Sequence, residues 1–97
     1  MPFPTCPPDP LEYALPAWRA THALGPYQHL HFERQVVPIL LAACAAYRAH
    51  PGQAGRMWRQ LTRELARQPA LHATDEELRG IAHDCWEDLL RAAQRAA

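Results

Sequence analysis

Ten prolines punctuate this 97-residue sequence, and five of them fall within its first ten residues. Proline has no backbone N–H and its ring clashes with the preceding helical turn, so a helix tolerates it only near the start. Residues 1–9 are therefore predicted to form a Pro-rich arm that is extended or disordered. Pro4, Pro7 and Pro10 also have the P-x-x-P spacing that docks in aromatic grooves, although an ordinary extended terminus explains them more simply. A single helical domain is predicted over residues 10–97.

Beyond the arm, apolar residues recur at helical spacing, and no segment supports a β-strand. Asp9 and Pro10 suit the N-cap and the first position of a helix. Pro16 is expected to restart or kink this helix, which then continues to a stop signal at residues 25–26, Gly-Pro. Residues 50–55, His-Pro-Gly-Gln-Ala-Gly, are expected to form a loop.

The segment from Tyr27 to His50 allows two interpretations, because Pro38 interrupts a broadly apolar helical pattern. In the first, one long helix kinks at Pro38. In the second, residues 27–32 are extended and the helix begins near Phe32. The kinked helix is preferred, because residues 42–46 are strong helix formers apart from one cysteine, and because no neighbouring segment supplies a second strand.

Two further helices are predicted toward the C-terminus. In residues 56–68, apolar side chains occupy one face and arginines the opposite face, and Pro69 ends the helix. Thr74 and Glu77 have the spacing of a capping box, in which each side chain bonds to the backbone N–H of the other residue. An apolar stripe then continues to about Gln94, formed by Leu78, Ile81, Ala82, Cys85, Trp86, Leu89 and Ala93. The segments together predict an all-α protein, a compact bundle of four to five helices.

The composition excludes several kinds of enzyme. All ten basic residues are arginine, and the sequence contains neither serine nor asparagine. Without lysine and serine, the chain cannot form a P-loop, a Schiff base or a Ser-His-Asp triad. Cys44 and Cys85 lie in apolar stripes and are interpreted as core residues, whereas Cys6 lies on the arm. We therefore expect a non-enzymatic protein with no catalytic residues and no cofactor.

Cysteine usage and hydropathy bear on the location of the protein. The three cysteines form no C-x-x-C pair. Their odd number, and the lack of a secretory signal pattern, favour a reducing, cytoplasmic environment. No uncharged stretch is longer than thirteen residues, the length of residues 35–47. A membrane-spanning helix needs about 18 or more, so we expect no membrane contact.

Six histidines raise the question of a metal site. Two sets of neighbouring residues have suitable ligand types, namely His29, His31 and Glu33, and His83, Asp84 and Cys85. In a helix, residues i and i+2 lie on different faces, so neither set chelates an ion unless its backbone is extended. We expect surface histidines and no bound metal.

The net charge is zero, but the charge is unevenly distributed. Residues 48–68 carry five arginines and one acidic residue, whereas residues 69–97 carry three arginines and six acidic residues. Helical spacing places four arginines on one face of the 56–68 helix, namely Arg56, Arg59, Arg63 and Arg67. A solvated face, a protein-binding surface and a nucleic-acid contact are the three interpretations of this stripe.

We favour protein binding, as an adaptor, regulator or inhibitor of a larger complex, because Arg pairs bidentately with carboxylates and stacks on aromatic rings. The expected partner is a protein, and an acidic surface would complement the stripe. The acidic last helix is another candidate to pair with the arginine stripe, either within the same chain or between two copies in a homodimer. The alternative is a nucleic-acid-binding protein that uses the same arginines on phosphates. Against it, Trp58 faces the core side of the helix, and Ser, Lys and Asn are missing.

Overall fold

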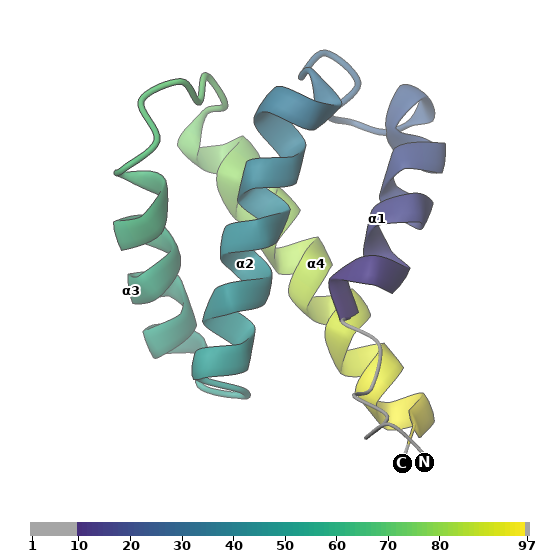
Figure 1. Ribbon diagram of the computed structural model, residues 1–97, viewed down its shortest axis with the longest axis vertical. Helices are drawn as coiled ribbons and strands as arrows, with labels where there is room; N and C mark the ends of the chain where they lie inside the picture. The colour runs from purple at the N-terminus through teal and green to yellow at the C-terminus, as the bar shows by residue number, and fades with distance from the viewer. Residues whose placement is uncertain (1–9, 97) are drawn as a thin grey trace, which may run out of the picture.

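The computed structural model describes the backbone of residues 10–96 and the side chains of residues 15–94. Over this range the chain is helical and contains no strand, which confirms the predicted all-α class. Four α-helices follow one another along the chain, namely α1 (Pro10–Thr21), α2 (Val37–Ala49), α3 (Ala54–Leu65) and α4 (Asp75–Ala96) (Figure 1). The predicted Pro-rich arm, with Asp9 and Cys6, lies outside the described residues.

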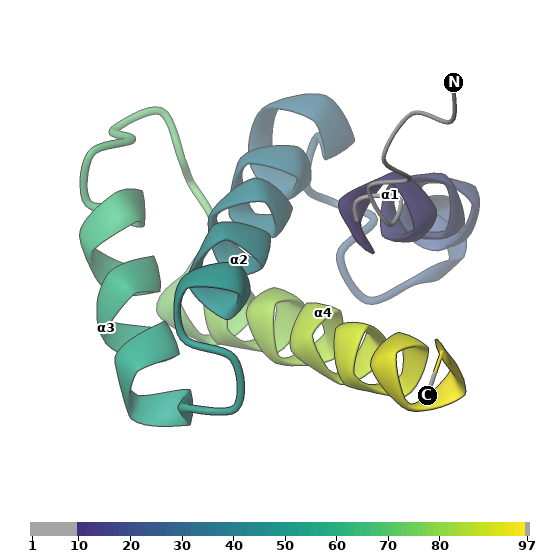
Figure 2. The same cartoon turned by 60° about the horizontal axis from the view of Figure 1, so that its bottom comes forward.

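Helix α2 lies at the centre of the bundle. Helices α3 and α1 flank it on opposite sides, and α4 crosses behind it (Figure 1). The turned view shows α4 running from beneath α2 past α1 (Figure 2). Accordingly, α2 packs against both α3 and α4, and α1 packs against α2 and α4. This position explains the broad apolar pattern of α2, whose buried residues are Ile39, Leu40, Ala42, Ala43, Cys44 and Ala46.

The preferred interpretation of the segment around Pro38, a long kinked helix from Tyr27, is wrong. The helix begins at Phe32 with a π-helical turn, Phe32–Val36, that continues into α2. The wider turn lets the Val37 N–H bond to the Phe32 carbonyl, five residues back, just before Pro38, which has no N–H to offer. The second interpretation gave the correct start, but residues 26–29 form turns instead of an extended segment.

The start of this helix is fixed by His31. Its backbone is extended, and its Nδ1 accepts a hydrogen bond from the Arg34 N–H at 3.2 Å. The His31 carbonyl accepts from the Gln35 N–H at 2.8 Å. Histidine therefore acts as the N-cap here, a role that Ser, Thr, Asp or Asn usually fills. The sequence contains no Ser or Asn, and no Thr or Asp lies in this segment.

Pro16 does not divide the first helix. Helix α1 runs continuously from Pro10 to Thr21 with Pro16 inside it, and a 3₁₀ turn, His22–Leu24, follows. Pro16 is exposed, and it leaves the helix without one backbone hydrogen bond at this turn. The segment stops at the predicted place, since the Gly25 N–H bonds back to the His22 carbonyl at 3.3 Å.

The connection between α3 and α4 is held by a buried glutamine. Gln35 donates from Nε2 to the Ala70 carbonyl at 3.0 Å and accepts at Oε1 from the His72 N–H at 2.7 Å. Helix α3 ends at Leu65 instead of Gln68, and the chain then closes with shorter turns. Pro69 disfavours helical geometry at the residue directly before it. The sequence pattern does not indicate this clamp, because its partners lie more than thirty residues apart.

The capping box before α4 is confirmed. The Thr74 N–H donates to Glu77 Oε1 at 2.9 Å, and the Glu77 N–H donates to Thr74 Oγ1 at 3.2 Å. Glu77 also contacts His29 Nε2 from the α1–α2 connection. The hydrogen bond from the Thr74 backbone, and next the one with His29, hold the pKa of Glu77 below its ordinary value. One carboxylate thus caps α4 and ties a distant loop to it.

Most of the predicted apolar stripe of α4 is buried in the core. Its buried members are Ile81, Ala82, Cys85, Trp86 and Leu89, whereas Leu78 is half-buried and Ala93 is exposed. The Trp86 indole N–H donates to the Ala43 carbonyl of α2 at 2.8 Å, which satisfies the buried donor. Among the described helices, none combines the length and the apolar character that crossing a bilayer requires.

The two described cysteines are core residues, as expected. Cys44 and Cys85 are both buried, and their sulfur atoms lie 3.8 Å apart across the contact between α2 and α4. The hydrogen bond with Cys44, together with burial, raises the pKa of the Cys85 thiol. Because the thiolate is the nucleophilic form, this environment disfavours nucleophilic catalysis at Cys85.

Candidate functional site

Three of the four predicted arginines lie together on the outer face of α3. Arg56, Arg59 and Arg63 are exposed and follow one side of the helix, and we call them the arginine face. Arg67 lies beyond the end of α3, in the turn that follows, and its Nη1 lies 3.9 Å from Glu64 Oε1. The predicted stripe is therefore shorter than expected, because the helix ends before Arg67.

The arginine face has no acidic partner within the described part of the chain. Two arginines elsewhere in the chain do have acidic neighbours. Arg19 pairs with Glu33 at 2.5 Å, and Arg91 lies 3.8 Å from both Glu87 and Asp88. The acidic residues described on α4 thus do not neutralise the arginine face within the chain, and the intramolecular counterpart considered from the sequence is not formed there.

A groove lies beside the arginine face, between α3 and the first turns of α4. It encloses about 700 Å³, and its lining residues are Trp58, Leu61, Thr62, Leu65, Ala66, Asp75, Leu78 and Arg79. Leu61 is buried, whereas Trp58, Leu65 and Leu78 are half-buried, so the groove has an apolar floor with partly open side chains. Trp58 is held by an edge-to-face contact with Trp86, with ring centroids 4.6 Å apart.

Helical geometry joins the groove to the arginine face. At about 100° per residue, Thr62 and Ala66 lie between the core side of α3 and the side that carries Arg59 and Arg63. Both intervening residues are small and exposed, and both line the groove. A molecule seated in the groove therefore meets guanidinium groups along the α3 edge, and we call the combined surface the arginine–groove surface. An apolar centre with a charged rim is typical of protein-binding sites.

The first predicted set of metal ligands is dispersed in the structure. His29 pairs with Glu77, His31 caps the helix that follows it, and Glu33 pairs with Arg19. Each side chain serves a different structural contact, so the histidines and Glu33 do not converge on one point.

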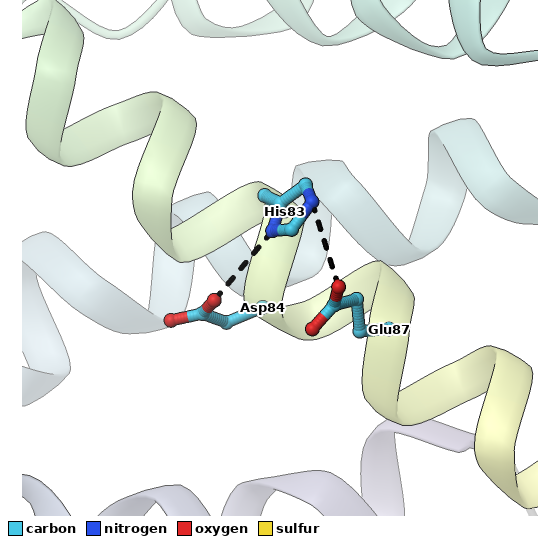
Figure 3. A group of neighbouring side chains, drawn as sticks. All are labelled: His83, Asp84 and Glu87. Atoms are coloured by element: carbon cyan, nitrogen blue, oxygen red, sulfur yellow. Dashed lines mark ion pairs between the residues drawn. The ribbon is translucent and has the colours of Figure 1, made fainter.

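In the second predicted set of metal ligands, Glu87 takes the place of Cys85 beside His83 and Asp84. His83 Nδ1 lies 3.7 Å from Asp84 Oδ1, and His83 Nε2 lies 3.6 Å from Glu87 Oε1 (Figure 3). Cys85 is buried in the core and takes no part. Glu87 was missed from the sequence, although the i,i+4 spacing from His83 would have indicated it. All three side chains are exposed and come from one stretch of helix, an arrangement typical of surface ion pairs.

The described residues thus gather one surface with the features of a binding site. It combines unpaired cationic side chains, an apolar groove and a fixed tryptophan, all positioned by α3 and the start of α4. No protein-family model, curated protein or solved structure matches this chain.

Proposed function

We propose that this protein is a small, non-enzymatic helical protein that binds an acidic, amphipathic segment of a larger protein on the arginine–groove surface. Apolar side chains of the partner occupy the groove, and its carboxylates pair with Arg59 and Arg63. Binding of this kind suits an adaptor, a regulator or an inhibitor of a larger complex. The observation that carries the proposal is the continuity between the unpaired arginine face and the apolar groove.

The clustering of the arginines on α3 supports binding over a merely solvated face. Arg19 and Arg91 are as exposed as ordinary surface residues, yet both lie near acidic side chains of the chain itself. Arg56, Arg59 and Arg63 share one helix with a single acidic residue, Glu64, so their charges add along the face. Arginine clusters of this kind are enriched in protein interfaces because each guanidinium offers several donors to carboxylates.

The groove favours a protein partner over a nucleic acid. Its lining is mainly apolar, which suits the apolar side chains of a protein segment better than phosphate groups. Trp58 packs against Trp86, so its ring has a structural partner instead of being a free platform for a base. A nucleic acid on the same arginines remains the competing outcome, as does a homodimer in which acidic residues of one copy meet the arginine face of the other.

The test uses defined probes. We expect a labelled amphipathic helical peptide with leucines on one face and glutamates beside them to bind, and the same peptide with lysines in place of glutamates not to bind. The double variant Arg59→Gln/Arg63→Gln should weaken binding by about tenfold or more, which corresponds to about 1.4 kcal/mol. The matched control Arg34→Gln/Arg91→Gln removes the same charge elsewhere and should change the affinity by less than about twofold.

Two results would contradict the proposal. The first is equal binding of the acidic and basic peptides. The second is preferential binding of single-stranded DNA with an affinity that falls steeply with salt, with a log–log slope of about −2 to −3 for three arginines, which would establish the nucleic-acid alternative. Sedimentation of the wild type and of the Arg59→Gln/Arg63→Gln variant separates the homodimer, since only a dimer built on this face dissociates in the variant.

A further inference from the structure

A second cavity lies on the opposite side of the bundle from α3. It encloses about 360 Å³ between the end of α1, the loop that follows it and the C-terminal half of α4. Helices α1 and α3 lie on opposite sides of α2 (Figure 1), so this cavity is separate from the arginine–groove surface. Its lining contains the aromatic residues Trp18 and Tyr27, the acidic residues Asp84, Glu87 and Asp88, and Arg91.

The two aromatic walls are positioned by contacts with the helices. Tyr27 packs directly on Gly80 of α4, where a Cβ atom would overlap the tyrosine hydroxyl. The glycine therefore lets the loop approach α4 closely enough to close one side of the cavity. Trp18 is half-buried on α1, and its indole nitrogen is shielded from solvent without an acceptor among the described residues. The ring is thus held in place by packing.

The cavity carries an excess of negative charge. Asp84, Glu87 and Asp88 contribute three carboxylates, and Arg91 is the single arginine of the lining. Arg91 lies 3.8 Å from both Glu87 and Asp88 and is exposed, so these pairs are loose. His83 contacts Asp84 and Glu87 from outside the cavity, and His22 lies in the lining. Burial and the negative charge of Asp84 together raise the pKa of Tyr27. The second cause is consistent with an excess of negative charge in the cavity.

We propose that this cavity binds a guanidinium or alkylammonium group. Carboxylates accept charge-assisted hydrogen bonds from such a group, and aromatic residues such as Trp18 and Tyr27 in the lining add attraction for a cation through their ring quadrupoles. The volume lies at the lower end of the range for ligand pockets, which suits one cationic side chain or a small amine better than a large ligand. The cation comes either from a free amine or from an arginine or lysine of a protein.

The primary test is an NMR titration of the intact chain with n-propylguanidinium, with n-propylurea as the neutral probe of similar shape. The sequence has three tryptophans, so the indole N–H signal of Trp18 is assigned with the Trp18→Phe variant. We expect saturable shifts of the Trp18 indole and Tyr27 backbone signals with the guanidinium and none with the urea. Equal shifts with both probes, or shifts that rise linearly without saturating, would overturn the proposal.

Two sets of variants locate the binding. Asp84→Asn/Asp88→Asn should weaken the apparent affinity by about tenfold, whereas Glu64→Gln/Glu76→Gln, with the same charge change outside the cavity, should alter it by less than about twofold. Thr21→Arg, at the cavity rim, keeps every carboxylate and supplies a tethered guanidinium, so it should abolish the response even if the double variant fails to fold. Equal weakening by both double variants, or an unchanged response in Thr21→Arg, contradicts the assignment.

The source of the cation is distinguished by the probes. A peptide with the sequence of residues 54–67 tests an arginine supplied by a second copy of the chain, and spermidine tests a free polyamine. Competition of either probe with n-propylguanidinium at the Trp18 signal supports the site and names the source. If neither these nor n-propylguanidinium moves that signal at low salt, where charge pairing is strongest, the cavity does not bind cations.

Discussion

Replacing Gly80 with alanine tests the contact that closes the second cavity. Tyr27 lies so close to Gly80 that an added Cβ atom would overlap the hydroxyl oxygen and lie 3.3 Å from Cζ. On helical propensity alone, Gly→Ala inside a helix should stabilise the protein by about 1 kcal/mol. Gly80 lies within α4, so both effects apply. The sign of the change in unfolding free energy depends on whether the overlap with Tyr27 costs more than the helix propensity gains.

The structure favours net destabilisation. Tyr27 must rotate or lift its loop away from α4, and overpacking of this kind costs about 1–3 kcal/mol. After subtraction of the propensity gain, we expect Gly80→Ala to lower the free energy of unfolding by about 1 kcal/mol, or the melting temperature by about 4–8 °C. Tyr27→Phe removes the overlapping oxygen, which has no hydrogen-bond partner among the described residues, and leaves only the milder contact with Cζ. In that background Gly80→Ala should be neutral or stabilising.

The assay is a double-mutant cycle measured by urea unfolding, followed by circular dichroism. We expect a coupling energy of at least about 1 kcal/mol between positions 27 and 80. Titration of the phenol group provides a second readout, because Gly80→Ala should move the pKa of Tyr27 back toward 10.0 as the ring leaves its buried position near Asp84. If Gly80→Ala stabilises the wild type and the Tyr27→Phe variant equally, Tyr27 does not pack on Gly80.

Three further outcomes are expected. Gln35→Leu should destabilise the protein by about 1–3 kcal/mol in urea unfolding, because it removes two hydrogen bonds to the α3–α4 connection; an unchanged midpoint would show that the clamp is not formed. Thr74→Ala should cost about 1 kcal/mol in urea unfolding. Because folding lowers the pKa of Glu77, the stability that Glu77 contributes is complete above its ordinary pKa of 4.5 and is lost as the pH falls through the folded-state pKa. In thiol labelling, Cys44 and Cys85 should stay unreactive in buffer and react after unfolding; rapid labelling of two or more thiols per native chain would contradict their burial.

Rules of helix capping and helical periodicity predicted those elements whose geometry depends on residues close together in the sequence. The capping box at Thr74 and Glu77 uses neighbours three residues apart, and the apolar stripe of α4 follows one helical period. Both were therefore readable from the sequence. The all-α class followed for the same reason, because apolar residues beyond the arm recur at helical spacing and no segment supports a β-strand.

The errors occurred where proline rules have more than one structural solution. Pro38 could follow a kink, begin a helix or sit after a widened turn, and the structure uses a π-helical turn from Phe32. At Pro16 the helix does not restart, since α1 continues past this exposed residue, whereas the expected kink stays a prediction. In both cases the choice depends on the surroundings of the proline, which a pattern of residue types does not contain.

The candidate sites show the same division between local and long-range information. Helical spacing identified Arg56, Arg59 and Arg63, but it did not show the groove beside them, because one wall of that groove comes from α4. The contacts of Tyr27 with Gly80 and of His29 with Glu77 join segments about fifty residues apart. Packing of loops onto α4 produces them, and no periodicity in either segment indicates the pairing.

The placement of charge gives the two proposed sites a common physical basis. Within the described part of the chain, α2 and its packing partners keep the unpaired arginines of α3 on one side and the carboxylates around Asp84 on the other, so these groups do not neutralise each other. At physiological ionic strength, exposed charges more than about 8–10 Å apart are largely screened from each other. Their interaction across the bundle therefore contributes little to the free energy of folding. A neutral chain with this arrangement retains two surfaces of opposite charge, one beside an apolar groove and one beside aromatic rings. Each remains available to a ligand of the complementary charge, and each is tested by variants that leave the other unchanged.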